Sequence, residues 1–289
     1  MVATTSPRPP ASRDVPLVAR RPLQGPYLLL TFRHPEVAGR TRAGQFVMIK
    51  ANTAADPLLR RPFSIMSVHP AEDTFTLFLK VVGSGTRALA DLRSGETAGC
   101  LGPLGRPFPM PPEDHEALLV AGGYGIAPFV LFGDELRRAG RRARAFYGGR
   151  TSGDLQGHDP FTALGLPLAC CTDDGSFGHH GRVTDAVEAY LDTRPGAVTL
   201  YACGPDAMLH AAARLAERRN VPAQVSLDPW MGCGVGTCLG CVVRIQRADE
   251  PRGKYRCACT EGPVFDARDV VWAGEGSSRA RREAAAVLR

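Results

Sequence analysis

Three cysteines lie close together near the C-terminus, in the segment MGCGVGTCLGC. Cys233, Cys238 and Cys241 form a C-x4-C-x2-C array, and Cys257 and Cys259 follow in YRCAC. Three thiols at this spacing, followed at a distance by a fourth, are typical of the ligands of a plant-type 2Fe–2S cluster. Zinc usually takes C-x2-C pairs, and only Cys238 and Cys241 make such a pair within the array. The spacing favours iron–sulfur over zinc and leaves both Cys257 and Cys259 open as the fourth ligand.

The cellular compartment of the protein also affects whether its cysteines bind a metal or form disulfides. The 289-residue chain has nine cysteines, and its first fifteen residues contain no apolar run long enough for a signal peptide. We therefore expect a cytoplasmic protein, in which cysteines are more often metal ligands or free thiols than disulfides.

Charge narrows the range of partners. The net charge of +6 comes mainly from scattered arginines, which are densest at residues 137–144 and in the C-terminal tail. These patches carry no aromatic residues, and no stretch approaches the length of a membrane span. We expect no nucleic acid and no membrane partner. The patches are interpreted as solvated helix faces, with a docking surface for an acidic partner as the alternative.

The elements that must position the cysteines change in character along the chain. The runs PYLLLTF, GQFVMIK, PFSIMSV and TFTLFLKVV are β-rich and predict an antiparallel barrel or sandwich. After the proline-rich segment GPLGRPFPMPPEDHE, apolar runs alternate with helix-like stretches, which predicts a doubly wound parallel sheet. The predicted fold is multidomain β plus α/β, with a disordered arm (1–16), a barrel (17–111), a nucleotide-binding parallel-sheet domain (112–225), a small 2Fe–2S domain (226–272) and a basic tail (273–289).

Two motifs in the barrel could hold a dinucleotide. In RRPFSIMSV, Arg61 offers a bidentate fork for pyrophosphate, and Pro62 fixes the backbone so that Ser64 can reach a ring edge. In VVGSGTRALADLRSGE, Thr86 is expected to cap a helix that starts at Arg87, and the amides at this helix start would form a second anion site. Gly83 and Gly85 permit close approach of the backbone to the anion. The structural alternatives are a strand with an arginine at its mouth and an ordinary capped helix.

Two strand-to-helix loops of the second domain suit nucleotide binding at the carboxyl edge of a parallel sheet. The first, ALLVAGGYGIAPF, has Gly122, Gly123 and Gly125 to let the backbone close on a ligand; the alternative is a tight turn. The second, YACGPDAM, places Cys203 at its tip, ahead of a helix started by Pro205. A lone cysteine there is often just a small buried residue.

A third strand end carries carboxylates. Asp173 and Asp174 in CTDDGSFGHHGRVTD can accept hydrogen bonds from ribose hydroxyls, and they would repel the extra phosphate of NADP. Arg150 in YGGRTSGDL has the opposite effect, because an arginine can pair with that phosphate. The balance favours NAD.

The segments GQFVMI, RRPFSI, GSGT and GPLG resemble, in order and spacing, the flavin-binding barrel of the ferredoxin–NADP reductase superfamily. The resemblance implies FAD, with Arg61, Pro62, Phe63 and Ser64 along the flavin and Gly85 and Thr86 at the pyrophosphate. It also implies that Cys203 lies where nicotinamide meets flavin. The residues expected to hold NAD come from the strand ends themselves and are Gly122, Gly123, Gly125, Asp173, Asp174, Gly204 and Pro205.

The cysteine array, with a last cysteine followed by two residues and GPVF, resembles the electron-transfer subunit of the NAD-dependent dihydroorotate dehydrogenases. The resemblance runs from about Leu17 to Val270 and implies Cys259 as the fourth ligand, with Cys257 a spare thiol. This chain departs from the family pattern in three ways: a longer gap between the third and fourth cysteines, an N-terminal arm and a basic C-terminal tail. It implies a conduit from NAD(H) through FAD to a 2Fe–2S cluster, serving an FMN-containing catalytic subunit in a heterotetramer that oxidises dihydroorotate in pyrimidine biosynthesis.

Two other functions fit part of the pattern. One is a reductase subunit for a ferredoxin, a hydrogenase or a bifurcating complex, because such relatives share the barrel and nucleotide motifs. The other is a nonenzymatic, zinc-bearing nucleotide sensor, which would require three motif sets to coincide by chance.

Overall fold

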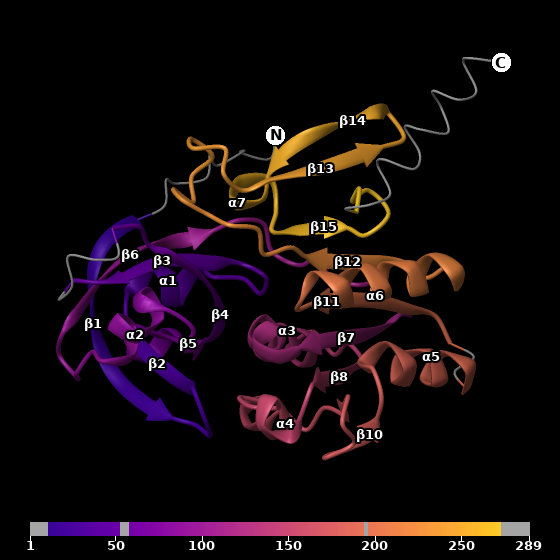
Figure 1. The fold of residues 1–289 in the computed structure, drawn as a ribbon, viewed down its shortest axis with the longest axis horizontal. Coiled ribbons are helices and arrows are strands. Elements are labelled where there is room, and N and C mark those ends of the chain that lie inside the picture. Colours follow the sequence, from indigo (N-terminus) through magenta and orange to yellow (C-terminus); the bar gives the residue numbers. More distant parts are fainter. Residues whose placement is uncertain (1–10, 53–57, 194–195, 273–289) are drawn as a thin grey trace.

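The computed structural model describes residues 11–52, 58–193 and 196–272, which form a barrel, a layered α/β part and a small C-terminal part (Figure 1). This order along the chain confirms the predicted fold class. Of the predicted N-terminal arm, residues 1–10 lie outside the described ranges, and so does the predicted basic tail at residues 273–289.

The first part is a closed six-stranded antiparallel barrel with the strand order β1-β2-β5-β4-β3-β6. Every residue of β5 from Thr74 to Leu79 is buried, so both faces of this strand are covered. The strands are β1 (Ala11–Pro22), β2 (Tyr27–Arg33), β3 (Phe46–Ala51), β4 (Arg61–His69), β5 (Thr74–Lys80) and β6 (Thr97–Leu104). The connecting helices are α1 (Pro35–Arg40), η1 (Pro70–Glu72) and α2 (Ser84–Ala90).

Strand β1 shows that the predicted disordered arm, residues 1–16, is wrong from residue 11 onward. Residues 11–16 pair with β6, and the strand then continues into its pairing with β2. Val15 and Leu17 are both buried inside the barrel. The polar, proline-containing sequence suggested disorder, but a strand with one solvated face needs an apolar residue only at every second position. The barrel therefore begins at Ala11 rather than at residue 17.

The second part is a seven-stranded sheet with the order β10-β9-β8-β7-β11-β12-β15. All neighbouring strands are parallel except β12 and β15. Every residue of β7 and β11 is buried, as expected for strands with helices on both faces. The strands are β7 (Glu116–Gly122), β8 (Ala143–Gly149), β9 (Leu168–Thr172), β10 (His179–His180), β11 (Val198–Cys203), β12 (Ala223–Ser226) and β15 (Val264–Asp266).

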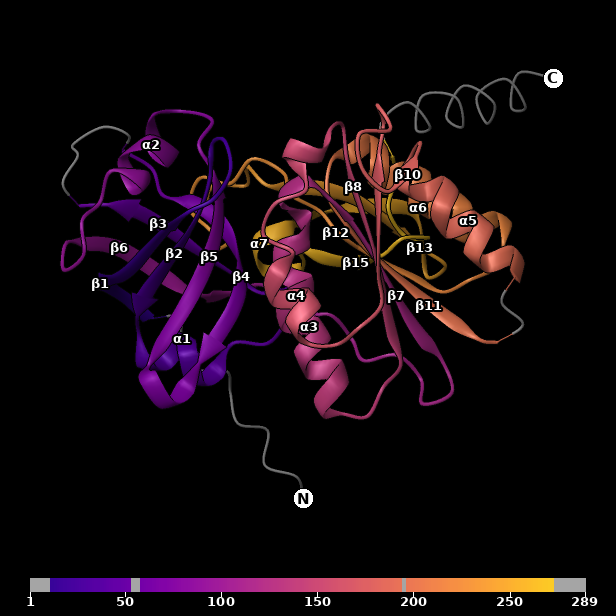
Figure 2. The same ribbon diagram turned by 90° about the horizontal axis from the view of Figure 1, so that it is seen from below.

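Helices cover both faces of this sheet, which confirms the doubly wound prediction. Helices α3 and α4 lie on the side toward the barrel, and α5 and α6 lie on the opposite side (Figures 1 and 2). The connections are η2 (Gly123–Ile126), α3 (Ala127–Arg138), η3 (Ser152–Asp154), α4 (Asp159–Ala163), α5 (Val183–Thr193) and α6 (Asp206–Arg218).

A shared aromatic core joins the barrel to the sheet. Phe108, in the segment leaving the barrel, packs against Phe129 and Phe132 of α3 with ring centroids 5.5 and 5.1 Å apart. Tyr201 of β11 packs edge-on against Phe132, and its hydroxyl donates to the Pro109 carbonyl at 2.9 Å. Because burial of large aromatic rings is a major source of packing energy, the two parts have a well-packed junction.

The third part is the hairpin β13 (Val242–Arg247) and β14 (Glu250–Cys257), followed by α7 (Ala258–Glu261). The chain then returns to β15, which pairs with β12, so the predicted 226–272 domain contributes its last strand to the large sheet. A three-residue strand is too short to show a periodic pattern in sequence.

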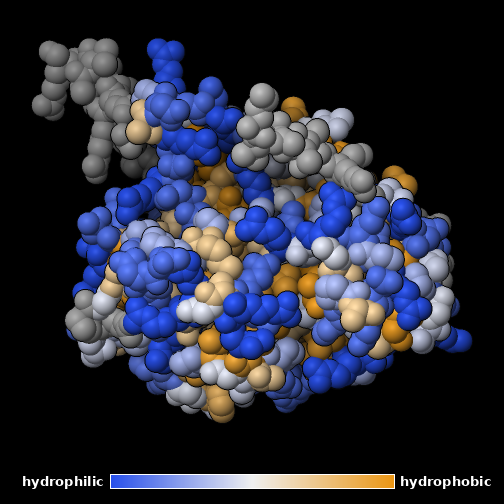
Figure 3. Space-filling view, turned by 180° about the vertical axis from the view of Figure 1, so that it is seen from behind, coloured by the Kyte–Doolittle hydropathy of each residue, from blue (hydrophilic) through white to orange (hydrophobic). Residues whose placement is uncertain are grey.

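No helix in the described ranges is long and apolar enough to cross a membrane. The face seen in Figure 3 is mainly hydrophilic, with apolar residues in separate patches.

Candidate functional site

The predicted flavin motif forms the first half of β4. Arg61, Pro62, Phe63 and Ser64 pair with residues 49 to 46 of β3, in antiparallel register. Arg61 is half-buried, and its Nη1 donates to the Leu59 carbonyl at 2.7 Å. That bond uses one donor of a five-donor guanidinium, so Arg61 keeps the bidentate capacity that a pyrophosphate requires.

The predicted anion site beside it has a different local structure. Helix α2 begins at Ser84, so the prediction that it starts at Arg87 with Thr86 as its cap is wrong. Thr86 is inside the first turn, where its hydroxyl accepts hydrogen bonds from the amides of Val82 at 2.9 Å and Gly83 at 3.0 Å. The Thr86 side chain therefore shapes the turn. The helix packs against β3, next to the flavin motif.

The two glycine loops of the parallel sheet contact each other at the carboxyl ends of β7 and β11. A Cβ at Gly125 would lie 2.1 Å from the Cys203 carbonyl oxygen, and one at Gly204 would lie 2.9 Å from the Gly122 amide nitrogen. Real Cβ atoms do not approach backbone this closely, so glycine is required for the loops to meet. The sequence predicted close approach to a ligand; the structure adds close approach between loops. Gly123, in contrast, faces open space at φ +53°.

Cys203 lies at this loop junction and is 9% exposed. Burial raises the pKa of its thiol to about 12, with a further upward contribution from Asp228 and a lowering one from its hydrogen bond with Ser226. The thiol is therefore neutral at physiological pH and can donate a hydrogen bond. Cys203 is the last residue of β11, the strand-end position that the sequence predicted, and the approach of a nicotinamide ring to it stays a prediction. Its neutral state disfavours a nucleophilic role.

Asp228 and Tyr124 complete this group, and neither was singled out from the sequence. Burial and the Asp206 charge raise the pKa of Asp228, and burial, Asp228 and Cys203 raise that of Tyr124. Tyr124 is in the glycine loop, whereas Asp228 lies two residues after the end of β12. The available signal for Asp228 was its place after the apolar strand AQVSL, at the same sheet edge as Cys203.

The acidic loop after β9 is ordered by its own hydrogen bonds. Asp174 Oδ1 accepts from the Ser176 amide at 3.0 Å and the Ser176 hydroxyl at 2.6 Å, which together outweigh desolvation and lower its pKa. Asp173 is exposed beside it. The Arg150 side chain is 81% exposed, and its Nε lies 3.8 Å from Asp154 Oδ2. The Asp174 amide donates to the Arg150 carbonyl at 3.2 Å, so these opposed charges lie beside each other, and ribose binding by Asp173 and Asp174 stays a prediction.

The cysteine array forms an irregular loop with several amides directed at sulfur. The Cys233 thiol accepts from the amides of Val235 and Cys238 at 3.4 Å each, and the Cys238 thiol accepts from Gly240 at 3.5 Å. Burial raises the pKa of Cys233, but the hydrogen bonds from Cys238 and Val235 outweigh it and lower the value to about 6. Amides directed at thiolates are what a 2Fe–2S site uses to stabilise negative sulfur.

Cys259 belongs to this loop by contact. Its thiol accepts a hydrogen bond from the Gly236 amide at 3.2 Å, and burial followed by its hydrogen bond with Cys241 raises its pKa to about 12. Cys257, at the end of β14, is half-buried and also lies beside Cys241. Among the residues that the structure describes, no three His, Cys, Asp or Glu side chains are gathered for a single metal ion.

The cluster loop packs directly on the flavin motif's neighbouring strand. Gly234 has φ +77°, and a Cβ there would lie 2.5 Å from Met48 Cγ and 3.1 Å from Leu104 Cδ1. Met48 pairs with Pro62 across β3 and β4. Thus a single strand separates the cysteine loop from the strand proposed to hold the flavin. Sequence reasoning could not find this contact, because residues 48 and 234 are far apart in the chain.

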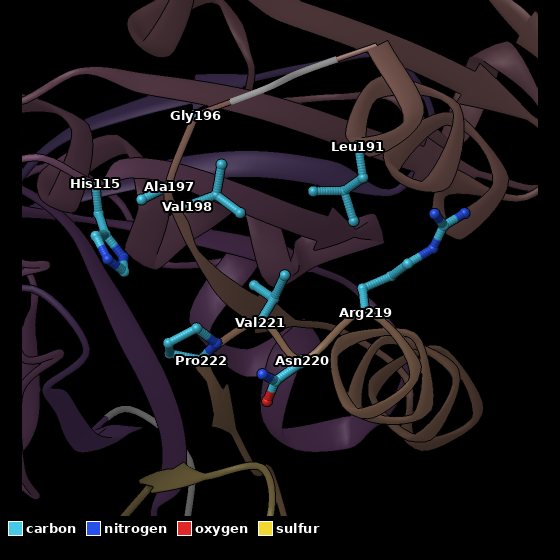
Figure 4. A pocket seen from close by; sticks show the side chains of 9 residues that line it. All are labelled: His115, Leu191, Gly196, Ala197, Val198, Arg219, Asn220, Val221 and Pro222. Atoms are coloured by element: carbon cyan, nitrogen blue, oxygen red, sulfur yellow. The ribbon is translucent and has the colours of Figure 1, made fainter.

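One cavity among the described residues lies away from these loops. It measures about 340 Å³ and is lined by His115, Val198 and Pro222, among others, at the amino ends of the parallel strands (Figure 4). Because each strand residue advances about 3.3 Å, it is roughly 16 Å from the Cys203 end of β11. It is distinct from the loops described above.

Known protein families match all three parts of the chain. The matching descriptions are "Oxidoreductase FAD-binding domain" over residues 23–108, "Oxidoreductase NAD-binding domain" over residues 119–214 and "Iron-sulfur cluster binding domain of dihydroorotate dehydrogenase B" over residues 228–271.

Similar proteins cover nearly the whole chain. The electron transfer subunit of dihydroorotate dehydrogenase B (NAD(+)) from Desulforamulus reducens is 36% identical over 243 residues, covering 84% of this chain and 92% of the relative. That from Geobacillus kaustophilus is 41% identical over 234 residues, covering 79% and 86%. Among solved structures, the NADH-dependent reduced ferredoxin–NADP oxidoreductase, a flavin-based bifurcating protein, has a TM-score of 0.79 at 30% identity, covering 91% of both chains. The ferredoxin reductase of carbazole 1,9a-dioxygenase shares the fold, with a TM-score of 0.65 at 23% identity, covering 75% of this chain and 68% of that one.

Proposed function

The chain belongs to the family of electron transfer subunits of dihydroorotate dehydrogenase B, and we propose that it moves electrons between NAD(H) and a separate catalytic subunit through FAD and a 2Fe–2S cluster. The observation that carries the proposal is the packing of Gly234 in the cysteine loop on Met48, the cross-strand neighbour of Pro62. Bound FAD supplies the conversion between the electron pair of a nicotinamide and the single electrons that an iron–sulfur cluster accepts.

The chain's own residues have binding and orienting roles in this scheme. Arg61 and the first turn of α2 hold the FAD pyrophosphate, and Pro62, Phe63 and Ser64 line the flavin ring. The loops after β7 and β11 receive the NAD pyrophosphate and nicotinamide, where the neutral Cys203 thiol orients the ring. Asp173 and Asp174 hold the adenosine ribose, which favours NAD over NADP. The full NAD set includes Gly122, Gly123, Gly125, Gly204 and Pro205.

For the cluster we propose Cys233, Cys238, Cys241 and Cys259 as ligands. The Gly236 amide bonded to Cys259 supports its inclusion, because it ties that thiol to the array loop. Cys257 is the alternative fourth ligand. Separate Cys257→Ser and Cys259→Ser variants distinguish the two by iron content: only the ligand variant should lose the cluster.

The partner is proposed to be an FMN-containing dihydroorotate dehydrogenase catalytic subunit, in a cytoplasmic heterotetramer serving pyrimidine biosynthesis. The described residues form an antiparallel barrel, a parallel sheet and a hairpin, with no (β/α)8 barrel among them. The chain alone is therefore expected not to oxidise dihydroorotate. Mixing it with the FMN subunit should restore dihydroorotate-dependent reduction of NAD.

A second candidate function is supported by the likeness to the bifurcating ferredoxin–NADP oxidoreductase, with its TM-score of 0.79. In that case the partner would be a ferredoxin, a hydrogenase or another bifurcating subunit. NADH-driven reduction of a ferredoxin, without any response to the FMN subunit, would favour it over the first proposal.

The direct test is an anaerobic visible spectrum of the purified chain, with iron, zinc and flavin analysis, before and after addition of NADH. Flavin bands and a red-brown 2Fe–2S envelope, both bleached by NADH, are expected. A colourless protein that contains zinc would contradict the proposal and make a nucleotide sensor the better interpretation.

A further inference from the structure

Asp154 of η3 connects the parallel-sheet part to the barrel. Its Oδ1 accepts a hydrogen bond from the Tyr27 hydroxyl at 2.9 Å and one from Lys80 Nζ at 3.2 Å. Tyr27 and Lys80 are directly opposite each other on β2 and β5. The Lys80 and Asp154 side chains are only 25% and 19% exposed, so this ion pair is less screened than a surface pair.

The backbone around Asp154 is held in place from the sheet side. The Tyr147 hydroxyl, from β8, lies 3.2 Å from the Asp154 carbonyl and 2.8 Å from the Gln156 carbonyl. Tyr147 is fully buried, so the anchor is rigid. Asp154 therefore links two fixed elements rather than a loose loop to a barrel.

Hydrogen bonds continue from this segment to the acidic loop after β9. The Ser152 amide donates to the Ser176 hydroxyl oxygen at 2.8 Å, and that hydroxyl donates to Asp174 Oδ1 at 2.6 Å. The Asp174 amide donates to the Arg150 carbonyl at 3.2 Å. One connected network thus runs from Tyr27 and Lys80 to the proposed ribose site.

At its other end the network is next to the proposed FAD site. Lys80 ends β5, and the turn bonded by Thr86 follows at Val82 and Gly83. The same carboxylate therefore joins the segment leading into the FAD pyrophosphate turn to the segment that recognises the NAD adenosine. Burial raises the pKa of Asp154, but the hydrogen bonds from Tyr27 and Lys80 outweigh it, so the carboxylate is ionised.

We infer that Asp154 is a positioning residue for hydride transfer, which sets the place of the NAD-recognition loops relative to the flavin. The inference rests on the proposed function, since it assumes that NADH is oxidised at this site. The positioning role differs from a binding role, because Asp154 acts through Ser152, Ser176 and Asp174 and is not proposed to contact either cofactor. Displacement of a reactant by about 1 Å can cost on the order of 10²-fold in rate.

The test compares Asp154→Ala, Asp154→Asn and Lys80→Met with the wild type in NADH-dependent ferricyanide reduction. In this assay NADH loses a hydride to FAD, and the reduced flavin passes the two electrons to two ferricyanide ions. Asp192→Asn is the matched control, because it removes a carboxylate that pairs with Arg219 at 2.7 Å inside the same part, away from the barrel. Flavin occupancy, KM, kcat and the rate of flavin bleaching are measured for each.

Asp154→Ala is expected to keep its FAD and lose about tenfold or more in kcat/KM for NADH, with slower flavin bleaching at saturating NADH. Asp154→Asn should recover part of the loss, because its amide oxygen still accepts from Tyr27. Lys80→Met should be impaired and Asp192→Asn should not. If Asp154→Ala does not fold, the kcat/KM values and flavin bleaching rates of Lys80→Met and Asp154→Asn test the inference instead.

Wild-type kcat/KM and bleaching in flavin-loaded Asp154 and Lys80 variants would overturn the inference. An equal loss in Asp192→Asn would overturn it too, since the effect would then be a general one on stability. Failure of the wild type to reduce ferricyanide with NADH would instead refute the proposed function.

Discussion

Replacing Gly234 with alanine should separate the cluster from the flavin-binding barrel. The residue has φ +77°, where an L-residue costs about 1–2 kcal/mol. Its new Cβ would lie 2.5 Å from Met48 Cγ, in the middle of a fully buried side chain whose end cannot simply swing away. Overpacking of this kind costs about 1–3 kcal/mol, so we expect a total penalty of about 2–5 kcal/mol on the docked loop.

The loop can avoid this penalty by moving away from β3. Ordinary contact begins at 3.4 Å, so the loop must retreat by about 0.9 Å at Gly234. We expect iron content, or the rate at which NADH bleaches the cluster, to fall, while flavin occupancy and ferricyanide reduction persist. Iron-to-flavin ratios and stopped-flow spectra measure both effects.

Gly240→Ala in the same loop is the control. A Cβ there would lie 3.6 Å from Cys238 Sγ, an ordinary contact, so this variant should retain the cluster and its rate of reduction. If Gly234→Ala matched the wild type in iron content and in cluster bleaching, the contact would not matter and the proposed route from flavin to cluster would lose its structural basis.

Four further predictions test the remaining parts of the site. Cys238→Ser should lose the cluster but keep NADH-to-ferricyanide transfer, and loss of dye reduction with FAD still bound would contradict a separable cluster. Arg61→Ala should lower flavin retention after gel filtration; unchanged occupancy would argue against pyrophosphate binding. Gly125→Ala, whose Cβ would lie 2.1 Å from the Cys203 carbonyl oxygen, should raise KM for NADH or unfold the sheet edge, and wild-type kinetics and melting would refute the packing argument. The pKa of Cys203 is about 12, against 9.0 for an ordinary thiol, so burial of the neutral thiol contributes stability below pH 9 that is lost as the pH rises from 9 toward 12. The free energy of unfolding should therefore fall more steeply above pH 9 in the wild type than in Cys203→Ala, and parallel curves of this free energy against pH would contradict the prediction.

The predictions from sequence succeeded where a short segment carries the whole signal. The four predicted strands of the barrel and the alternating strands and helices are local patterns of apolar residues, and each formed the expected element. They failed where a local pattern was ambiguous. The β1 segment is polar and contains proline, and its inclusion depends on pairing with β6, about 90 residues away. The start of α2 was misplaced because Thr86 bonds backward to Gly83 instead of capping a helix at Arg87.

The candidate site divides in the same way. The C-x4-C-x2-C spacing determined the class of metal centre, because so short a loop limits how its three thiols can be arranged around it. The glycine loops and the acidic turn likewise indicated nucleotide binding from their positions at strand ends. Resemblance, rather than spacing, selected Cys259, and its hydrogen bond from Gly236 now supports that choice.

By itself, the sequence determined the kinds of cofactor and the order of the parts that hold them, since both are encoded in segments of about ten residues. Tertiary structure alone decided that Gly234 packs on Met48, that Asp228 lies by Cys203, and that Asp154 bonds Tyr27 and Lys80. These contacts join segments brought together by barrel closure and sheet packing. No local pattern specifies them, because each depends on where several distant elements come to rest.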